Sequence, residues 1–175
     1  KEYRRQRQMC IRDSYCYQVA GTVGRLMATL LGVRSGDEAA ADRAARALGA
    51  AMQRPNILRD VDEDLANGRV YLPATALRRA GLDPEARTGA TSLRDGDRRS
   101  LYRAEIARAD AEYAIGIAGI RHLLHGRGSI RVAAYLYREI LRQIERDGLG
   151  ARRPHRPVVG RGRKLGLLVR AAVGA

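Results

Sequence analysis

The residues best suited to chemistry lie in one segment, residues 53–73, QRPNILRDVDEDLANGRVYLP. An α-helix turns by roughly 100° per residue, so residues spaced by three, four and four positions lie within about 60° of one another. Four side chains with an oxygen atom have this spacing: Gln53, Asn56, Asp60 and Asp64. They are expected to form one stripe, whereas Asp62 is expected on the opposite face, in water.

The spacing of the two aspartates predicts a cation site. Carboxylates four residues apart on a helix repel each other. Mg²⁺ removes such repulsion and is commonly held by one or two carboxylates together with substrate phosphates. Arg59 lies about a third of a turn away and offers a planar fork of donors that suits phosphate. The residues therefore indicate a Mg²⁺–diphosphate site.

A bland alternative is a solvated acidic helix face. Such a face gives no reason to align Gln53 and Asn56 with the carboxylates. The stop signal Asn67-Gly68 follows the stripe at once, so the stripe occupies the last turns of its helix.

Two segments carry a family resemblance. NILRDVDED followed by GRVYLP resembles the second aspartate-rich motif of the squalene/phytoene synthases, which are head-to-head prenyl transferases. YCYQVAGTVG, residues 15–24, is similar to a helix that precedes this motif in the family. The resemblance covers Tyr15 to Ala175. It implies an all-α, isoprenoid-synthase-type helical bundle whose N-terminal helices are missing, with residues 15–175 as the C-terminal portion of a single domain.

The resemblance also implies roles for individual residues. The implied metal ligands are Asn56, Asp60 and Asp64, and the implied diphosphate contacts are Gln53, Arg59 and Tyr137. Catalysis is assigned to Asp60, Asp64, Arg59 and Tyr71, with Tyr71 in the pocket wall. The substrate chain is expected against Tyr15, Val19, Ala20 and Val23 of the first helix, which Met27 and Leu31 extend. Arg54-Pro55 departs from the family pattern, and a kink at Pro55 is expected to displace Gln53.

The implied activity joins two geranylgeranyl diphosphates into phytoene, a step of carotenoid synthesis. It uses Mg²⁺-assisted diphosphate ionisation, with Mn²⁺ as a substitute metal, and a presqualene-type cyclopropyl intermediate. The runner-up is presqualene diphosphate or squalene formation from farnesyl diphosphate, and NADPH is expected only there. Since the first aspartate motif is absent, the chain alone is expected to be inactive. An alternative of another class is a non-catalytic basic helical binding protein.

The first fourteen residues are set apart. RRQRQMCIRDS reads as the translation of a common transposon-based sequencing adapter, so residues 1–14 are predicted to be a non-native leader. The chain has 33 Lys and Arg against 19 Asp and Glu, net +14, of which five basic and two acidic leader residues supply +3, leaving +11. Phe and Trp are absent and no nucleic-acid-binding motif appears, so nucleic acid is not an expected partner.

Composition also bears on location. No segment approaches the roughly 18 apolar residues of a membrane span. Outside the leader Cys16 is the one thiol, which suits a reducing cytosol. A cytoplasmic protein is expected. Peripheral contact with the inner face of the membrane is left open. Arg163 and Lys164 are expected to face either the diphosphate end of the pocket or an anionic membrane surface.

The patterning predicts helices at 15–33, 36–66, 74–80, 92–124, 129–147 and 163–173. Ser35 with Glu38 resembles a capping box that opens the second helix near Gly36, and Ser92 and Ser129 are expected caps. Small residues in the first helix are expected to let a neighbouring helix or ligand approach closely.

Overall fold

The computed structural model describes residues 17–83, 86–152 and 154–173. In chain order the helices are η1 (Tyr17–Gly21, a π-helical turn), α2 (Thr22–Leu31), α3 (Glu38–Arg59), α4 (Val61–Ala66), α5 (Ala74–Arg79), α6 (Ala86–Asp95), α7 (Arg99–Gly119), η2 (Ile120–His122, a 3₁₀ turn), α8 (Arg127–Arg146) and α9 (Arg161–Val173). Within these ranges, β-type pairing is limited to an isolated bridge between Val33 and Leu123. The predicted all-α class is confirmed.

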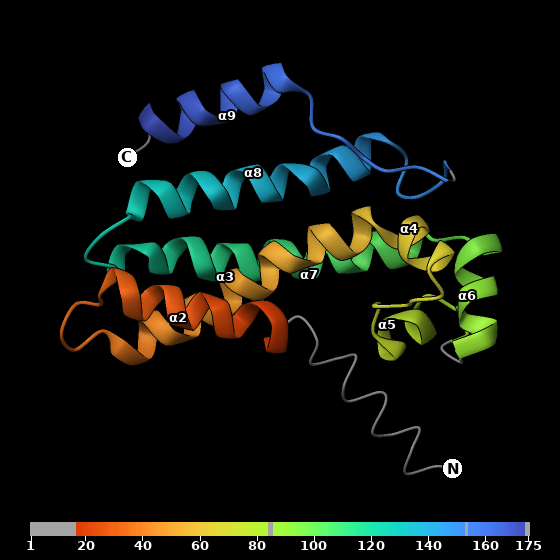
Figure 1. Cartoon of the computed structure of the whole chain (residues 1–175), viewed down its shortest axis with the longest axis horizontal. Helices are drawn as coiled ribbons and strands as arrows, with labels where there is room; N and C mark the ends of the chain where they lie inside the picture. The colour runs from red at the N-terminus through yellow and green to blue at the C-terminus, as the bar shows by residue number, and fades with distance from the viewer. Residues whose placement is uncertain (1–16, 84–85, 153, 174–175) are drawn as a thin grey trace, which may run out of the picture.

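The centre of the molecule is the pair α3 and α7, which make the most extensive contact between any two helices. In Figure 1, α2 lies on one side of this pair, α8 on the other, and α9 outside α8. Apolar residues such as Ala51, Leu101, Ala109 and Leu141 are fully buried where α3, α7 and α8 meet. Removing this apolar surface from water is the main force that holds the helices together.

Small residues allow η1 and α7 to pack closely against α3. A Cβ added to Gly49 would lie 2.2 Å from the carbonyl oxygen of Ala20 in η1, and one added to Gly119 of α7 would lie 2.0 Å from the Cβ of Ala44. Real side chains never come this close, so glycine is required at both contacts. The expected close approach of the first helical segment to a neighbouring helix is confirmed.

The predicted helix 36–66 is two helices. α3 continues through Pro55, and the interruption falls at Asp60, whose φ of −98° and ψ of 9° separate α3 from α4. The helix also begins later than predicted, because Gly36 has a φ of +88°, which an α-helix does not allow. Glu38 still reaches back, and its Oε1 accepts the Gly36 N–H at 3.2 Å.

The predicted helix 92–124 is also divided, into α6, α7 and η2. Ser92 lies inside α6 and is not a cap; its Oγ accepts the N–H of Asp83 at 3.2 Å and so joins α6 to the preceding turn. Ser129 likewise lies inside α8, which begins at Arg127. Both serines therefore lie inside helices. A sequence pattern alone does not distinguish a serine inside a helix from one that caps its start.

Candidate functional site

The four residues of the predicted stripe line one pocket despite the break at Asp60. This carboxylate pocket has a volume of about 190 Å³, and its walls are Gln53, Asn56, Ile57, Asp60, Glu63, Asp64 and Tyr71. The amide of Asn56 donates to Oε1 of Gln53 at 3.4 Å, so Arg54-Pro55 does not carry Gln53 away from Asn56. Tyr71 lines the same pocket as Asp64.

Asp60 is held by two arginines. Arg59 donates to both of its carboxylate oxygens, Nε to Oδ1 at 2.8 Å and Nη2 to Oδ2 at 2.7 Å. Arg156, which follows α8, donates from Nε to Oδ1 at 3.1 Å, and its Nη1 lies 3.6 Å from Oε2 of Glu63. Burial alone would raise the pKa of Asp60, but the Arg59 hydrogen bond and the charges of both arginines outweigh it and lower that pKa.

Asp64 has the opposite electrostatic setting. Burial raises its pKa, and the neighbouring charges of Asp60 and Glu63 raise it further. This is the repulsion that a cation would relieve, so the donor set of two carboxylates and the Asn56 amide fits Mg²⁺. Among the described residues, no three His, Cys, Asp or Glu side chains converge on a complete metal site. Asn56, Asp60 and Asp64 can therefore supply only part of an octahedral shell, with water or phosphate oxygens for the rest.

The expectation that Asp62 points into water is wrong. Its Oδ1 lies 2.7 Å from Nη1 of Arg98, whose side chain is 1% exposed, and its Oδ2 accepts the backbone N–H of His155 at 3.1 Å. The reason is tertiary: α4 packs against α6 and the turn that follows it, so the face opposite the stripe is covered. Helical periodicity placed Asp62 on the correct face and could not show that this face is buried.

An apolar cavity of about 350 Å³ lies between η1, α2, α3, α7 and α8. The residues that were predicted to line it and do so are Val19, Ala20, Val23, Met27 and Leu31. Tyr15 falls outside the described residues. Gln53 and Asn56 belong to both this cavity and the carboxylate pocket, so the apolar space opens directly onto the predicted metal ligands.

A third cavity, of about 400 Å³, lies between α8 and the segment that leads into α9. We call it the cationic pocket because Arg59, Arg156 and Lys164 line it and, in the part of the chain that the structure describes, no carboxylate does. Tyr137 is shared by this pocket and the apolar cavity. Lys164 thus lies at the polar end of the site, whereas Arg163 pairs with Glu139.

Sequence reasoning missed Arg156 as a site residue. The available signal was a stretch without acidic residues after Asp147 that is rich in arginine. That composition does not tell which arginine returns to the carboxylates. Only the fold brings Arg156 beside Asp60.

The unusual Arg54 has a structural explanation. Its side chain is 6% exposed and points away from the carboxylate pocket to α7, where Nη1 donates to Glu105 at 2.7 Å. Nε and Nη2 donate to the two carboxylate oxygens of Glu112 at 2.7 and 2.9 Å. Because the guanidinium has charged partners, Arg54 joins α3 to α7 at the level of the site.

The chain is similar to known proteins in sequence and in fold. A family profile described as squalene/phytoene synthase matches residues 6–163. Phytoene synthase from Thermus thermophilus is 49% identical over 138 residues, which are 77% of this chain and 44% of that protein.

Solved structures show the same fold. A dehydrosqualene synthase in complex with a ligand aligns with a TM-score of 0.72 and 26% identity, over 93% of this chain and 56% of that one. A squalene synthase from Alicyclobacillus acidocaldarius aligns with a TM-score of 0.66 and 30% identity, over 79% of this chain and 51% of that one. The chain thus spans about half the length of these relatives or less.

Proposed function

This chain belongs to the squalene/phytoene synthase family, and we propose that it forms one wall of an active site that joins two prenyl diphosphates head to head. The observation that carries the proposal is the continuity of three cavities. An apolar cavity opens through Gln53 and Asn56 onto carboxylates and through Tyr137 onto cations. This arrangement matches a molecule with a long hydrocarbon chain and a metal-bound diphosphate at one end.

On this proposal, Asn56, Asp60 and Asp64 hold Mg²⁺, or Mn²⁺ in its place. The bound metal supplies Lewis-acid stabilisation of the negative charge that develops on a departing diphosphate. The raised pKa of Asp64 supports this assignment because burial and the charges of Asp60 and Glu63 outweigh the opposing charge of Arg69.

The cationic pocket then binds phosphate oxygens. Arg59 and Arg156 are already beside the carboxylates, where both pair with Asp60. A metal ion on Asp60 would replace the arginines as its countercharge and leave their donors for the diphosphate. Arg59 offers a planar fork for this contact, and Lys164 adds a point charge from α9.

The apolar cavity protects the allylic cation that ionisation leaves behind. Val19, Ala20 and Val23 present no nucleophile. Tyr137 lies at the junction between the hydrocarbon and the polar end, where the face of its ring can stabilise positive charge. Tyr71 lines the carboxylate pocket together with Asp64, and we assign it to the diphosphate end of the substrate.

We favour geranylgeranyl diphosphate as substrate and phytoene as product because the phytoene synthase of T. thermophilus is 49% identical to this chain. The alternative is farnesyl diphosphate, converted to presqualene diphosphate or squalene, and the squalene synthase and dehydrosqualene synthase neighbours support keeping it. NADPH enters only if squalene is formed. The alternative of another class, a non-catalytic basic helical binding protein, predicts no diphosphate release in the test below.

The membrane surface is proposed as a second partner. No helix among the described residues has the length and apolar character needed to cross a bilayer. Val158, Leu165 and Leu168 are nevertheless exposed at 69%, 63% and 42%, close in sequence to Arg161 and Arg163. Basic and apolar side chains together favour the surface of an anionic membrane. Equal co-sedimentation with anionic and neutral liposomes would exclude this contact.

The substrate assignment is tested in an active enzyme that contains this chain. Each diphosphate is supplied with Mg²⁺, with and without NADPH, and products are identified by mass spectrometry. We expect a C40 hydrocarbon from geranylgeranyl diphosphate without NADPH. A C30 product alone would establish the farnesyl alternative, and the absence of any diphosphate release would refute prenyl transfer. The chain expressed alone is expected to release none.

A further inference from the structure

Two site cations lie close together in the sequence, Arg156 in the connection between α8 and α9 and Lys164 in the first turn of α9. We call residues 154–164, which comprise the end of this connection and that first turn, the C-terminal strap. The strap carries Arg156 and Lys164 of the cationic pocket. In Figure 1 the connection between α8 and α9 turns at the same end of the molecule as α4. A mostly irregular segment of this kind needs anchors if it is to aim two side chains at one pocket.

The first anchor is Asp62, two positions after a predicted metal ligand. One oxygen faces Nη1 of the buried Arg98 at 2.7 Å, and the other accepts the N–H of His155 at 3.1 Å. The ring of His155 is held as well, with Nε2 at 2.9 Å from Oδ2 of Asp147. His155 immediately precedes Arg156. The residue before the first cation is therefore fixed through both its backbone and its side chain.

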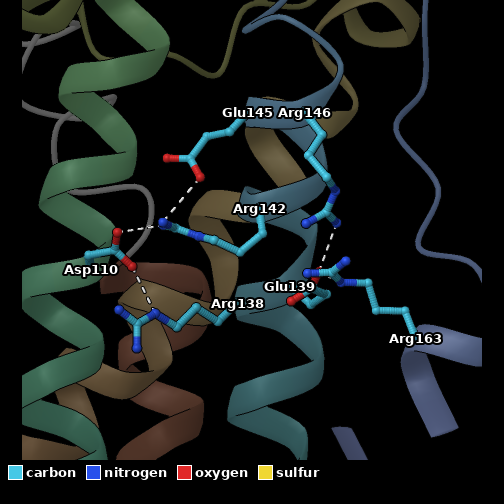
Figure 2. Close-up of polar contacts among 7 residues, drawn as sticks. All are labelled: Asp110, Arg138, Glu139, Arg142, Glu145, Arg146 and Arg163. Carbon is cyan, nitrogen blue, oxygen red and sulfur yellow. Dashed lines mark hydrogen bonds and ion pairs between the residues drawn. The ribbon is translucent and has the colours of Figure 1, made fainter. Parts of the chain in front are cut away.

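The second anchor is Glu139 on α8, whose side chain is 8% exposed. Figure 2 shows Glu139 between Arg146 of the same helix, at 2.7 Å, and Arg163 of α9. Arg163 immediately precedes Lys164. The second cation therefore also follows a residue that an almost buried carboxylate holds.

Figure 2 also shows what supports this helix. Asp110 of α7 pairs with Arg138 at 2.8 Å and with Arg142 at 2.5 Å, both on α8. The helix that carries Glu139 is thus tied to the central pair α3 and α7. A displacement of the strap would have to break ion pairs that lead back to the core.

We propose that Asp62 and Glu139 are positioning residues, which hold the C-terminal strap so that Arg156 and Lys164 face the bound diphosphate. One oxygen of Asp62 lies beside Arg98 and the other accepts the N–H of His155, so this side chain links the strap backbone to a buried cation. The diphosphate part of this proposal rests on the proposed function, whereas the anchoring part does not.

The anchors are tested in the whole chain by hydrogen exchange and mass spectrometry. The variants are Asp62→Asn/Arg98→Met, which removes both charges of a buried pair, His155→Ala and Glu139→Gln. Glu145→Gln is the control, because Glu145 is exposed on α8 and, within the described part of the chain, forms its ion pair with Arg142. We expect amide exchange in the strap to become roughly tenfold faster, because each variant loses about one charged hydrogen bond. Exchange in α7 should not change. Unchanged strap exchange in all three variants would overturn the anchoring.

Positioning is tested by the affinity for inorganic pyrophosphate with Mg²⁺, measured by calorimetry on the active enzyme that contains this chain. Each anchor variant should weaken binding several-fold, and His155→Ala should have no further effect in an Arg156→Gln background. Full additivity of the two substitutions would show that His155 does not act through Arg156. If the wild-type enzyme that contains this chain binds no pyrophosphate, the diphosphate part and the proposed function are refuted, while the exchange data still decide the anchoring.

Discussion

Nε of Arg156 lies 3.1 Å from Oδ1 of Asp60, although 96 positions separate the two residues in the sequence. This contact makes the C-terminal strap a part of the site. It also gives the two predicted metal-binding aspartates different surroundings, since Asp60 has two arginine partners and Asp64 has carboxylate neighbours.

The first prediction concerns the order in which these carboxylates titrate. The pKa of Asp64 is raised and that of Asp60 is lowered, so Asp64 takes up its proton first as the pH falls. Because the folded-state pKa of Asp64 is raised, its contribution to stability is lost as the pH rises through that pKa. Because the folded-state pKa of Asp60 is lowered, its contribution is lost as the pH falls through that pKa. Carbon-13 NMR of the aspartate carboxyls measures both.

Arg156→Gln provides the matched variant for this titration. It should raise the pKa of Asp60, because one of the charges that lowers it is gone, and leave Asp64 unchanged. Simultaneous titration of the two carboxylates in the wild-type chain would show that the arginines do not distinguish them.

The second prediction concerns the buried ion pairs of Arg54. Arg54→Met removes the charged partner of Glu105, whose side chain is 7% exposed, and should lower the free energy of unfolding by about 3–5 kcal/mol. Urea denaturation measures it. The control is Arg108→Met, because Arg108 is 50% exposed and lies 3.7 Å from Glu112, so the expected loss is below about 1 kcal/mol. Equal losses would mean that Arg54 does not join α3 to α7 as described.

The third prediction concerns the close approach of η1 to α3. Gly49→Ala places a Cβ 2.2 Å from a backbone oxygen and should cost about 1–3 kcal/mol of unfolding free energy. Gly166→Ala in α9 meets nothing within 4 Å and should instead stabilise the chain by about 0.5–1 kcal/mol, since alanine favours helix. Thermal unfolding of both variants is the measurement. A neutral Gly49→Ala would contradict the packing of these backbones.

Part of the site could be predicted because it depends on local periodicity. The steps of three and four residues keep Gln53, Asn56 and Asp64 in the wall of one pocket although the helix is interrupted at Asp60, because α4 follows α3 after that single residue. The apolar positions of the first helical segment were predictable on the same ground. The family motifs supplied the chemistry of these positions.

The remaining features depend on contacts between distant residues. The partner of Asp62 in the strap is 93 positions away, and the partners of Arg54 are 51 and 58 positions away. A single sequence contains no periodic signal for such pairs. For this reason Asp62 was expected in water. For the same reason Arg54-Pro55 was expected to displace Gln53, although Gln53 and Asn56 remain in contact.

The predicted division at residue 14 lies outside the described residues. It remains a prediction, and amplification of the gene from its source DNA would test it.

The fourth prediction addresses the central claim, that Asp60 and Asp64 hold the metal which activates a prenyl diphosphate. The measurement is Mg²⁺-dependent diphosphate release from geranylgeranyl diphosphate in an active enzyme containing this chain, with helix content followed by circular dichroism. We predict that Asp60→Asn and Asp64→Asn each lower turnover by roughly a hundredfold or more, as expected for a lost charge-stabilising group. Glu145→Gln should leave turnover unchanged. Near-normal turnover with the same Mg²⁺ dependence in Asp64→Asn would contradict the account.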